Sequence, residues 1–172
     1  MIKGLSMFSN VGIAETYLKE IGIDIIIANE LDSNRANLYK ELYGKTKMIQ
    51  GDIRDKIDEI IEISLKNKVQ FLIATPPCQG FSIAGRRDYT DDRNDLIHYV
   101  LKAIDKINPE YVVIENVQNF LKHSITYGKY KGSIISVIKR KFSNKYNIEH
   151  GILNAKDYGV PQVRKRAFII MK

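Results

Sequence analysis

Apolar and polar residues alternate along the chain in blocks that predict strands and helices in turn. Residues 23–28 and 69–74 are short runs of β-branched and other apolar residues, which is typical of strands buried on both faces. Residues 33–43 and 54–66 have the pattern of helices, and Gly44 lies where the first of them should end. The same pattern predicts further strands at 5–8, 45–49, 111–114, 146–153 and 166–171, and further helices at 13–21, 96–107 and 133–141.

This order of elements predicts an α/β fold with a doubly wound, mostly parallel sheet of the Rossmann-like kind, in a single domain spanning residues 1–172. Polar side chains come just after four of the predicted strands, at Glu30, Asp52, Cys78 and Glu115. Because the carboxyl ends of parallel strands share one edge of the sheet, we expect these four side chains to converge on one crevice.

The composition narrows the class of protein. With 172 residues, 44% of them hydrophobic, the chain is long enough for one domain with a core. No apolar run could span a membrane, the start is too short for a signal peptide, and one cysteine forms no disulfide framework, so we expect a cytoplasmic protein. His98, His123 and His150 are scattered and no second cysteine accompanies them, so we expect no metal site.

The charge is unbalanced, with 27 Lys and Arg against 20 Asp and Glu, a net charge of +7. Such an excess fits a polyanionic partner, but a lysine-rich surface without a partner would give the same count. The clusters at 86–87, 139–141 and 164–166 favour nucleic acid.

The lone cysteine has an unusual setting. It lies in Thr-Pro-Pro-Cys-Gln-Gly at residues 75–80, directly after a predicted strand. The two prolines end the strand and stiffen the turn, which favours a reactive Cys78 over a buried structural one. This stretch resembles the catalytic Pro-Cys-Gln motif of the cytosine-5 DNA methyltransferases.

Other motifs of that family follow in the same order. Residues 8–13 resemble its cofactor loop Phe-x-Gly-x-Gly-Gly, with Asn10 and Ile13 in place of two glycines. Residues 115–117 match Glu-Asn-Val, residues 162–166 match Gln-x-Arg-x-Arg, and residues 92–96 resemble the loop-to-helix element that follows the cysteine. The resemblance therefore identifies the chain as the catalytic part of such an enzyme, without the target recognition domain and the C-terminal motifs.

The resemblance implies S-adenosylmethionine as cofactor and S-adenosylhomocysteine as product. Glu30 would accept hydrogen bonds from the ribose hydroxyls, a role that an acidic residue at this place has in dinucleotide folds. Asp52 would accept from the adenine amino group, and Ile53 would pack on the ring. The full set of cofactor contacts that we expect is Phe8, Asn10, Val11, Gly12, Glu30, Leu31, Asp52, Ile53, Pro77 and Leu96.

The implied reaction is methyl transfer to carbon 5 of cytosine in DNA. A Cys78 thiolate would add to carbon 6 and make carbon 5 nucleophilic. Glu115 would hold ring nitrogen 3 and the exocyclic amine, Arg166 would contact ring oxygen 2, and Arg164 would support the site. The two arginines would also favour the thiolate.

Such chemistry requires double-stranded DNA with the cytosine flipped out of the stack. Ser82, Arg86 and Arg87 would then lie near phosphates. We expect a second polypeptide or segment to supply the recognition region and the final helix of the cofactor pocket, as in a split restriction-modification methyltransferase.

Three alternatives remain open at this point. The substrate could be cytosine in RNA, because one branch of the family methylates transfer RNA with the same motifs. The chain could also be a non-catalytic fragment that binds cofactor or DNA. A generic dinucleotide-binding oxidoreductase fits the predicted fold but not the Pro-Pro-Cys-Gln turn.

Overall fold

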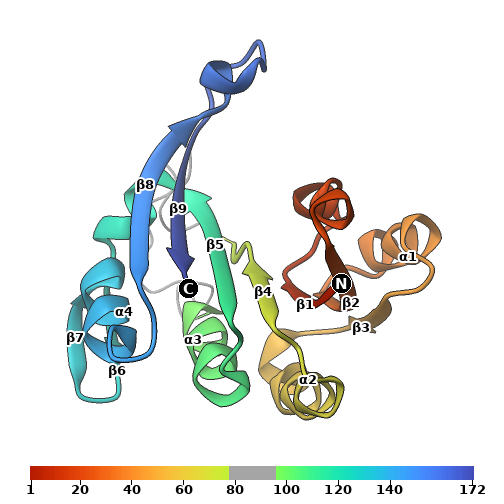
Figure 1. Cartoon of the computed structure of the whole chain (residues 1–172), viewed down its shortest axis with the longest axis horizontal. Coiled ribbons are helices and arrows are strands. Elements are labelled where there is room, and N and C mark those ends of the chain that lie inside the picture. Colours follow the sequence, from red (N-terminus) through yellow and green to blue (C-terminus); the bar gives the residue numbers. More distant parts are fainter. Residues whose placement is uncertain (78–95) are drawn as a thin grey trace. The chain divides into compact units, whose positions relative to one another are not determined.

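The computed structural model describes residues 1–77 and 96–172 (Figure 1). These residues form two compact units, the first made of residues 1–76 and 96–112, the second of Pro77 and residues 113–172. Within the described ranges, no helix is long and apolar enough to cross a membrane.

The first unit contains a parallel sheet in the order β3-β2-β1-β4. Strand β1 pairs in parallel with β2 and with β4, and β2 pairs in parallel with β3. The chain therefore winds outward from β1 to β3 and then crosses to the other side of β1, which is the reversal of a doubly wound sheet. The bounds are Ile2–Met7 for β1, Ile23–Glu30 for β2, Lys47–Gln50 for β3 and Phe71–Ala74 for β4.

Three helices belong to the same unit: α1 (Ser33–Leu42), α2 (Ile53–Asn67) and α3 (Leu96–Ile107). Helices α2 and α3 pack side by side (Figure 1), and both bury their apolar faces. On their exposed side, the Lys102 ammonium lies 2.7 Å from the Asp58 carboxylate. Such an exposed pair contributes little, so burial of the apolar faces is what joins the two helices.

The helix predicted at 13–21 is wrong as a continuous element. The structure has two short 3-10 turns instead, η1 (Ile13–Glu15) and η2 (Leu18–Ile21), and Gly22 ends the second in a left-handed conformation. The reason lies in Glu15, which is buried and accepts hydrogen bonds from the hydroxyls of Ser6 and Tyr39. Because a buried carboxylate must be hydrogen-bonded, this tether prevails over helical periodicity.

The second unit contains strands in the order β5-β9-β8, with β8 and β9 antiparallel. The first two residues of β5 still belong to the first unit. A small hairpin, β6 with β7, packs on helix α4; the sequence pattern did not predict this hairpin, whose strands have few buried residues. The bounds are Tyr111–Val117 for β5, Gln118–Lys122 for η4, Ser124–Tyr127 for β6, Tyr130–Ser133 for β7, Ile134–Phe142 for α4, Ile148–Asn154 for β8, Ala155–Tyr158 for η5 and Lys165–Met171 for β9.

Two strands run further than their apolar patterns predict. Glu30 is the last residue of β2, and Glu115 lies inside β5, although both were expected just past a strand. Hydrogen bonds stabilise the longer β2: the side-chain amide of Asn29 donates to the carbonyls of Ile49 at 2.8 Å and Gly51 at 3.1 Å. The polar ends of strands are thus held by hydrogen bonds that an apolar pattern cannot reveal.

We predict that Glu15→Ala lowers the free energy of unfolding by about 1–3 kcal/mol, because two buried hydroxyls lose their acceptor. Urea denaturation measures this change. The matched control is Glu20→Ala, which removes an exposed glutamate of the same segment and should change stability by less than about 0.5 kcal/mol.

Glu15 also makes the folding stability depend on pH. Burial raises the pKa of Glu15 above its ordinary value of 4.5, so the folded state holds the proton more tightly than the unfolded state. The stability of the wild type relative to Glu15→Gln should therefore fall as the pH rises above that ordinary value. Parallel stability curves for the two proteins would contradict this assignment.

Candidate active site

The loop after β1 is a tight turn with several residues in left-handed backbone conformations. Phe8, Asn10 and Gly12 all have positive φ, at 60°, 52° and 83°. Positive φ is rare for residues other than glycine, and asparagine tolerates it better than most. Asn10, which stands where the family motif has glycine, thus adopts a left-handed backbone, which is open to glycine as well. Ser9 holds the loop to β2, since its backbone N–H donates to the Asn29 carbonyl at 2.9 Å.

Glu30 joins this loop to the start of α1. Its side chain is 7% exposed. The backbone N–H of Asn10 donates to Oε2 at 2.9 Å, and the backbone N–H of Asp32 donates to Oε1 at 3.0 Å. Each carboxylate oxygen can accept a second hydrogen bond, so Glu30 keeps acceptor capacity for two hydroxyls. This arrangement fits the ribose of S-adenosylmethionine.

Tyr43 supports the loop from the opposite side, and sequence reasoning missed it. Its hydroxyl donates to the Gly12 carbonyl at 2.8 Å, and its ring lies 4.7 Å from the Tyr39 ring, centroid to centroid. A Cβ added at Gly12 would lie 2.3 Å from Cε2 of Tyr43. Position 12 therefore requires glycine for space as well as for its φ of 83°. No local sequence signal marks Tyr43, which follows the last residue of α1.

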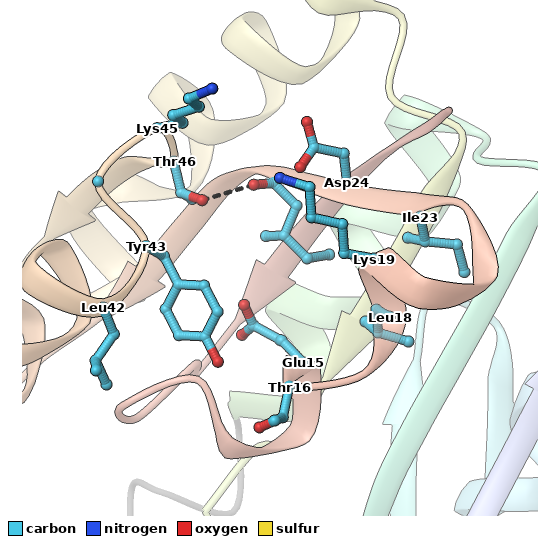
Figure 2. Close-up of a pocket in the computed structure, with 12 residues that line it drawn as sticks. Glu15, Thr16, Leu18, Lys19, Ile23, Asp24, Leu42, Tyr43, Lys45 and Thr46 are labelled. Carbon is cyan, nitrogen blue, oxygen red and sulfur yellow. Dashed lines mark hydrogen bonds between the residues drawn. The ribbon is translucent and has the colours of Figure 1, made fainter.

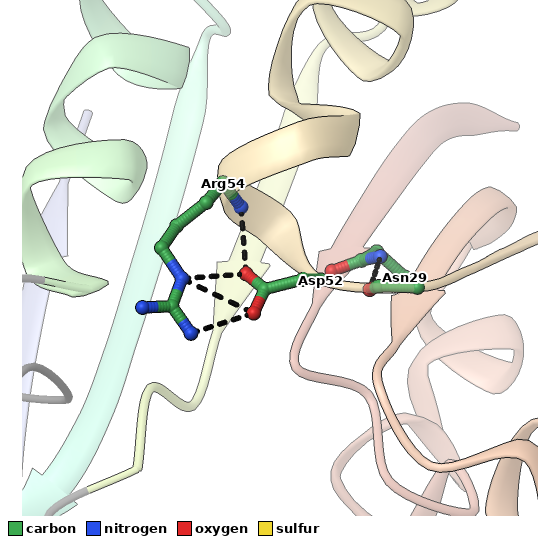
Figure 3. Close-up of polar contacts among 4 residues, drawn as sticks. Asn29, Asp52 and Arg54 are labelled. Carbon is green, nitrogen blue, oxygen red and sulfur yellow. Dashed lines mark hydrogen bonds and ion pairs between the residues drawn. The ribbon is translucent and has the colours of Figure 1, made fainter.

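Asp52 is the N-cap of α2 and accepts from the backbone N–H of Arg54 at 2.9 Å. Figure 3 shows the Arg54 guanidinium turned onto the same carboxylate, with Nη2 at 2.7 Å from Oδ2. The hydrogen bond from the Arg54 side chain lowers the pKa of Asp52. An ionised acceptor of this kind suits an amino group. The Asp52 carboxylate would accept hydrogen bonds both from Arg54 and from the adenine amino group.

The remaining cofactor candidates differ in exposure. Leu31 is 62% exposed, directly after Glu30, whereas Ile53 is 3% exposed and faces the core. Leu96, at the start of α3, is also buried, and Val11 and Pro77 are half-buried. Of the apolar candidates, Leu31 therefore offers the most open surface to a ligand.

A separate pocket of about 340 Å³ opens beside the start of β2 (Figure 2). Glu15 and Tyr43 border it together with the lysines Lys19 and Lys45. None of the predicted cofactor residues lines it. Glu15 and Tyr43 thus form part of the wall of this pocket, and the pocket is not the predicted crevice.

In the second unit, Glu115 of β5 pairs with Arg166 of β9. Arg166 Nε lies 3.0 Å from Glu115 Oε1, and the two side chains are 24% and 26% exposed. Burial raises the pKa of Glu115, while Arg166 and then Arg164 act in the opposite direction. A carboxyl group with a raised pKa beside two cations can hold a proton at a higher pH than a free glutamate and keep a fixed position.

Arg164 is placed by its backbone. Its N–H donates to Oδ1 of the buried Asn154 at 3.0 Å, and its carbonyl accepts from Ala155 at 3.0 Å. These bonds hold the Gln-x-Arg-x-Arg segment against the end of β8. Asn154 is a second residue that sequence reasoning missed.

Cys78, Ser82, Arg86 and Arg87 lie outside the described residues. The stretch that leads to Cys78 is described as far as Pro77. Within it, the hydroxyl of Thr75 donates to the Phe8 carbonyl at 2.9 Å. The approach to Cys78 is therefore joined to the loop after β1. Across residues 1–77 and 96–172, no group of three His, Cys, Asp or Glu side chains could hold a metal ion.

Comparisons with known proteins show the family of this chain. The family described as C-5 cytosine-specific DNA methylase matches residues 2–172. Type II methyltransferase M1.HgaI of Avibacterium volantium is 47% identical over 175 residues, which cover 98% of this chain and 49% of that protein. Type II methyltransferase M.AquIA of a Picosynechococcus species is 32% identical over 181 residues, covering 98% of this chain and 71% of that protein.

Solved structures give the same fold. A prophage-encoded protein from E. coli, described as a DNA modification methyltransferase, has a TM-score of 0.76 at 29% identity and covers 99% of this chain and 46% of its own. Spodoptera frugiperda DNMT2 has a TM-score of 0.77 at 22% identity over the whole of this chain and 50% of its own. The predicted Rossmann-like α/β fold is thus confirmed.

The chain spans about half the length of M1.HgaI and of the two solved structures. The match nevertheless extends over nearly all of this chain, and it includes both the loop after β1 and the Glu115–Arg166 pair. Enzymes of this kind take the methyl group from S-adenosylmethionine, as the motifs implied. The chain belongs to the C-5 cytosine-specific DNA methylase family.

Proposed function

We propose that this chain carries the catalytic and cofactor-binding part of a type II restriction-modification methyltransferase that methylates carbon 5 of cytosine in double-stranded DNA. The observation that supports this most is the ion pair of Glu115 with Arg166, because a half-buried carboxyl beside cations fits a group that must protonate and hold a cytosine ring. S-adenosylmethionine, when bound, supplies an electrophilic methyl group.

The chain's own part in the reaction starts at Cys78. Its thiolate forms a bond to carbon 6 of the ring, and the electrons of the carbon 5–carbon 6 double bond become available at carbon 5. Glu115 donates a proton to ring nitrogen 3 and so neutralises the charge that develops there. After methyl transfer, a base removes the proton from carbon 5, the double bond re-forms, the thiolate leaves, and ring nitrogen 3 returns its proton to Glu115.

The cofactor would be held by the first unit. The Glu30 carboxylate has room for two ribose hydroxyls, and Asp52 is an ionised acceptor for the adenine amino group. Leu31, which directly follows Glu30, offers an exposed apolar side chain to the cofactor. No step of the chemistry depends on these residues, so they should affect binding rather than the reaction itself.

We further propose that a target recognition region and a cofactor-pocket helix come from another segment or a second polypeptide. The matched relative M1.HgaI contains about as much chain again as this one. The first unit also exposes three large apolar side chains at intervals of four residues, Ile13, Tyr17 and Ile21, at 76%, 72% and 71%. Large exposed apolar side chains that are close in the sequence are typical of a surface that another element covers.

The direct test is trapping on DNA that contains 5-fluorocytosine, which blocks the removal of the group at carbon 5. Mass spectrometry should find one covalent adduct, at Cys78, and Cys78→Ser should abolish both the adduct and tritium transfer from labelled S-adenosylmethionine. The assay should be run on DNA and on RNA, with the 172-residue chain alone and with the remaining half of a relative added. An adduct at another residue would overturn the mechanism, and efficient sequence-specific methylation by the chain alone would overturn the need for a second segment.

For cofactor binding, we predict that Glu30→Ala and Asp52→Ala each weaken S-adenosylmethionine by roughly 1–3 kcal/mol, because each removes a charge-assisted hydrogen bond. Isothermal calorimetry measures the change directly. Asp55→Ala is the matched control, since it removes an acidic residue from the exposed first turn of α2. Unchanged affinity in both test variants would place the cofactor elsewhere.

For the proton donor, we predict that Arg166→Gln raises the pKa of Glu115 further. Burial already raises this pKa, and Arg166 is the first of the groups that act against it, so its removal leaves the neutral carboxyl more favoured. Titration of the carbon-13 signal of the Glu115 carboxyl measures the shift. Lys165→Gln, which removes an exposed cation next to Arg166, should leave the titration almost unchanged.

A further inference from the structure

Positive charge is concentrated in one stretch of the second unit. Residues 116–148 contain seven Lys and Arg and no Asp or Glu, so this stretch holds a surplus equal to the net charge of the whole chain, +7. The rest of the chain has equal numbers of acidic and basic residues. We refer to these seven side chains as the basic hairpin–helix surface: Lys122, Lys129, Lys131, Lys139, Arg140, Lys141 and Lys145.

The fold brings the hairpin and the helix of this surface together. The β6–β7 hairpin packs on α4 (Figure 1), and Nη1 of Arg140 donates to the Lys131 carbonyl at 3.2 Å. Arg140 and Lys129 both lie over the ring of Tyr130, at 5.5 Å and 5.6 Å from its centroid. Cations from separate elements therefore gather around one aromatic ring, where cation–π attraction holds them.

Helix stability explains only a part of this arrangement. Basic residues in the last turn of a helix interact favourably with its dipole, and α1, α2 and α3 each have one such lysine: Lys40, Lys66 and Lys106. Helix α4 has three cations in its last turn. The dipole gives no reason for the cations of the hairpin, and like charges brought together repel one another.

The surface is open and polar. Six of its seven basic side chains are exposed, and Lys141 is half-buried. Residues 116–148 include no exposed large hydrophobic side chain. Protein interfaces depend on buried apolar and aromatic anchors at their centre, whereas contacts to a nucleic acid backbone are made mainly by lysine and arginine. These features favour a phosphate backbone over a protein partner.

The surface is also separate from the catalytic pair within the same unit. Helix α4 leads into Ile148, which pairs with Met171 at the far end of the β8–β9 ladder. Arg166 pairs with Leu153, five residues further along β8. At about 3.3 Å per residue, this corresponds to roughly 17 Å along the strands.

We propose that the basic hairpin–helix surface is a second contact site for double-stranded DNA, which binds the phosphate backbone without regard to sequence. The inference rests on the proposed function in so far as DNA is the substrate. A contact of this kind holds the enzyme on DNA through counterion release while the catalytic pair is not engaged. It adds affinity and no base specificity.

The test measures binding of the 172-residue chain to a fluorescent duplex of dA and dT alone. Such a duplex contains no cytosine, so the result does not depend on methyl transfer. The test variant is Lys131→Gln/Lys139→Gln/Lys145→Gln. The matched control is Lys40→Gln/Lys66→Gln/Lys106→Gln, which removes the same charge from exposed last-turn lysines of the first unit. Thermal unfolding checks that both variants fold.

We expect the test variant to bind the duplex more weakly and to lose salt dependence, by about 0.9 in the slope of log K against log salt for each contact removed. The control variant should keep the slope of the wild type, and a Lys→Arg version of the test variant should restore it. Equal losses in test and control variants, or no loss in either, would overturn the proposal. A larger loss of binding to poly-glutamate than to the duplex would point to an acidic protein partner and would also overturn it.

Discussion

The first unit depends on one buried carboxylate. Glu30 accepts a backbone N–H from the loop after β1 and another from the start of α1, so a single side chain fixes two segments that are separated by the whole of β2. A carboxyl group at 7% exposure needs such donors to satisfy its oxygens. Positive φ at Phe8 and Asn10 is maintained by this bond and by the bonds of Ser9 to β2. The geometry offered to a cofactor is therefore preorganised by the protein itself.

A second buried carboxyl group, that of Glu15, has donors of a different kind. Glu15 accepts from two hydroxyls, and burial raises its pKa, whereas Glu30 accepts from two backbone amides. Hydroxyl donors can rotate to suit either state of the carboxyl, but backbone amides require an acceptor. Glu15 thus ties β1 to α1 through Ser6 and Tyr39, whereas Glu30 ties the loop to the start of α1 and keeps further lone pairs.

The sequence predicted an element well where local apolar periodicity determines it, and poorly where tertiary contacts do. Residues 96–107 form a helix with the predicted bounds, because apolar periodicity alone determines an amphipathic helix. Residues 13–21 do not, because the tether of Glu15 is a tertiary contact with no local pattern. The β6–β7 hairpin was missed for a similar reason, since it gains its burial from α4. For the candidate site, strand ends indicated Glu30 and Asp52, and motifs indicated Glu115 and Arg166; their roles stay predictions. Tyr43, Asn29 and Asn154 act through backbone carbonyls and amides that no motif records.

The hydrogen bond from Thr75 to the Phe8 carbonyl has a thermodynamic consequence. It joins the segment three residues before Cys78 to a residue whose backbone is already strained. A ligand that holds Phe8 in place thereby also restricts Thr75, and a substrate that restricts the segment around Thr75 favours the same state of Phe8. By reciprocity of linked equilibria, each ligand then changes the affinity for the other by the same factor. The Thr75 hydroxyl is thus a direct link through which the loop after β1 and the segment before Cys78 are coupled.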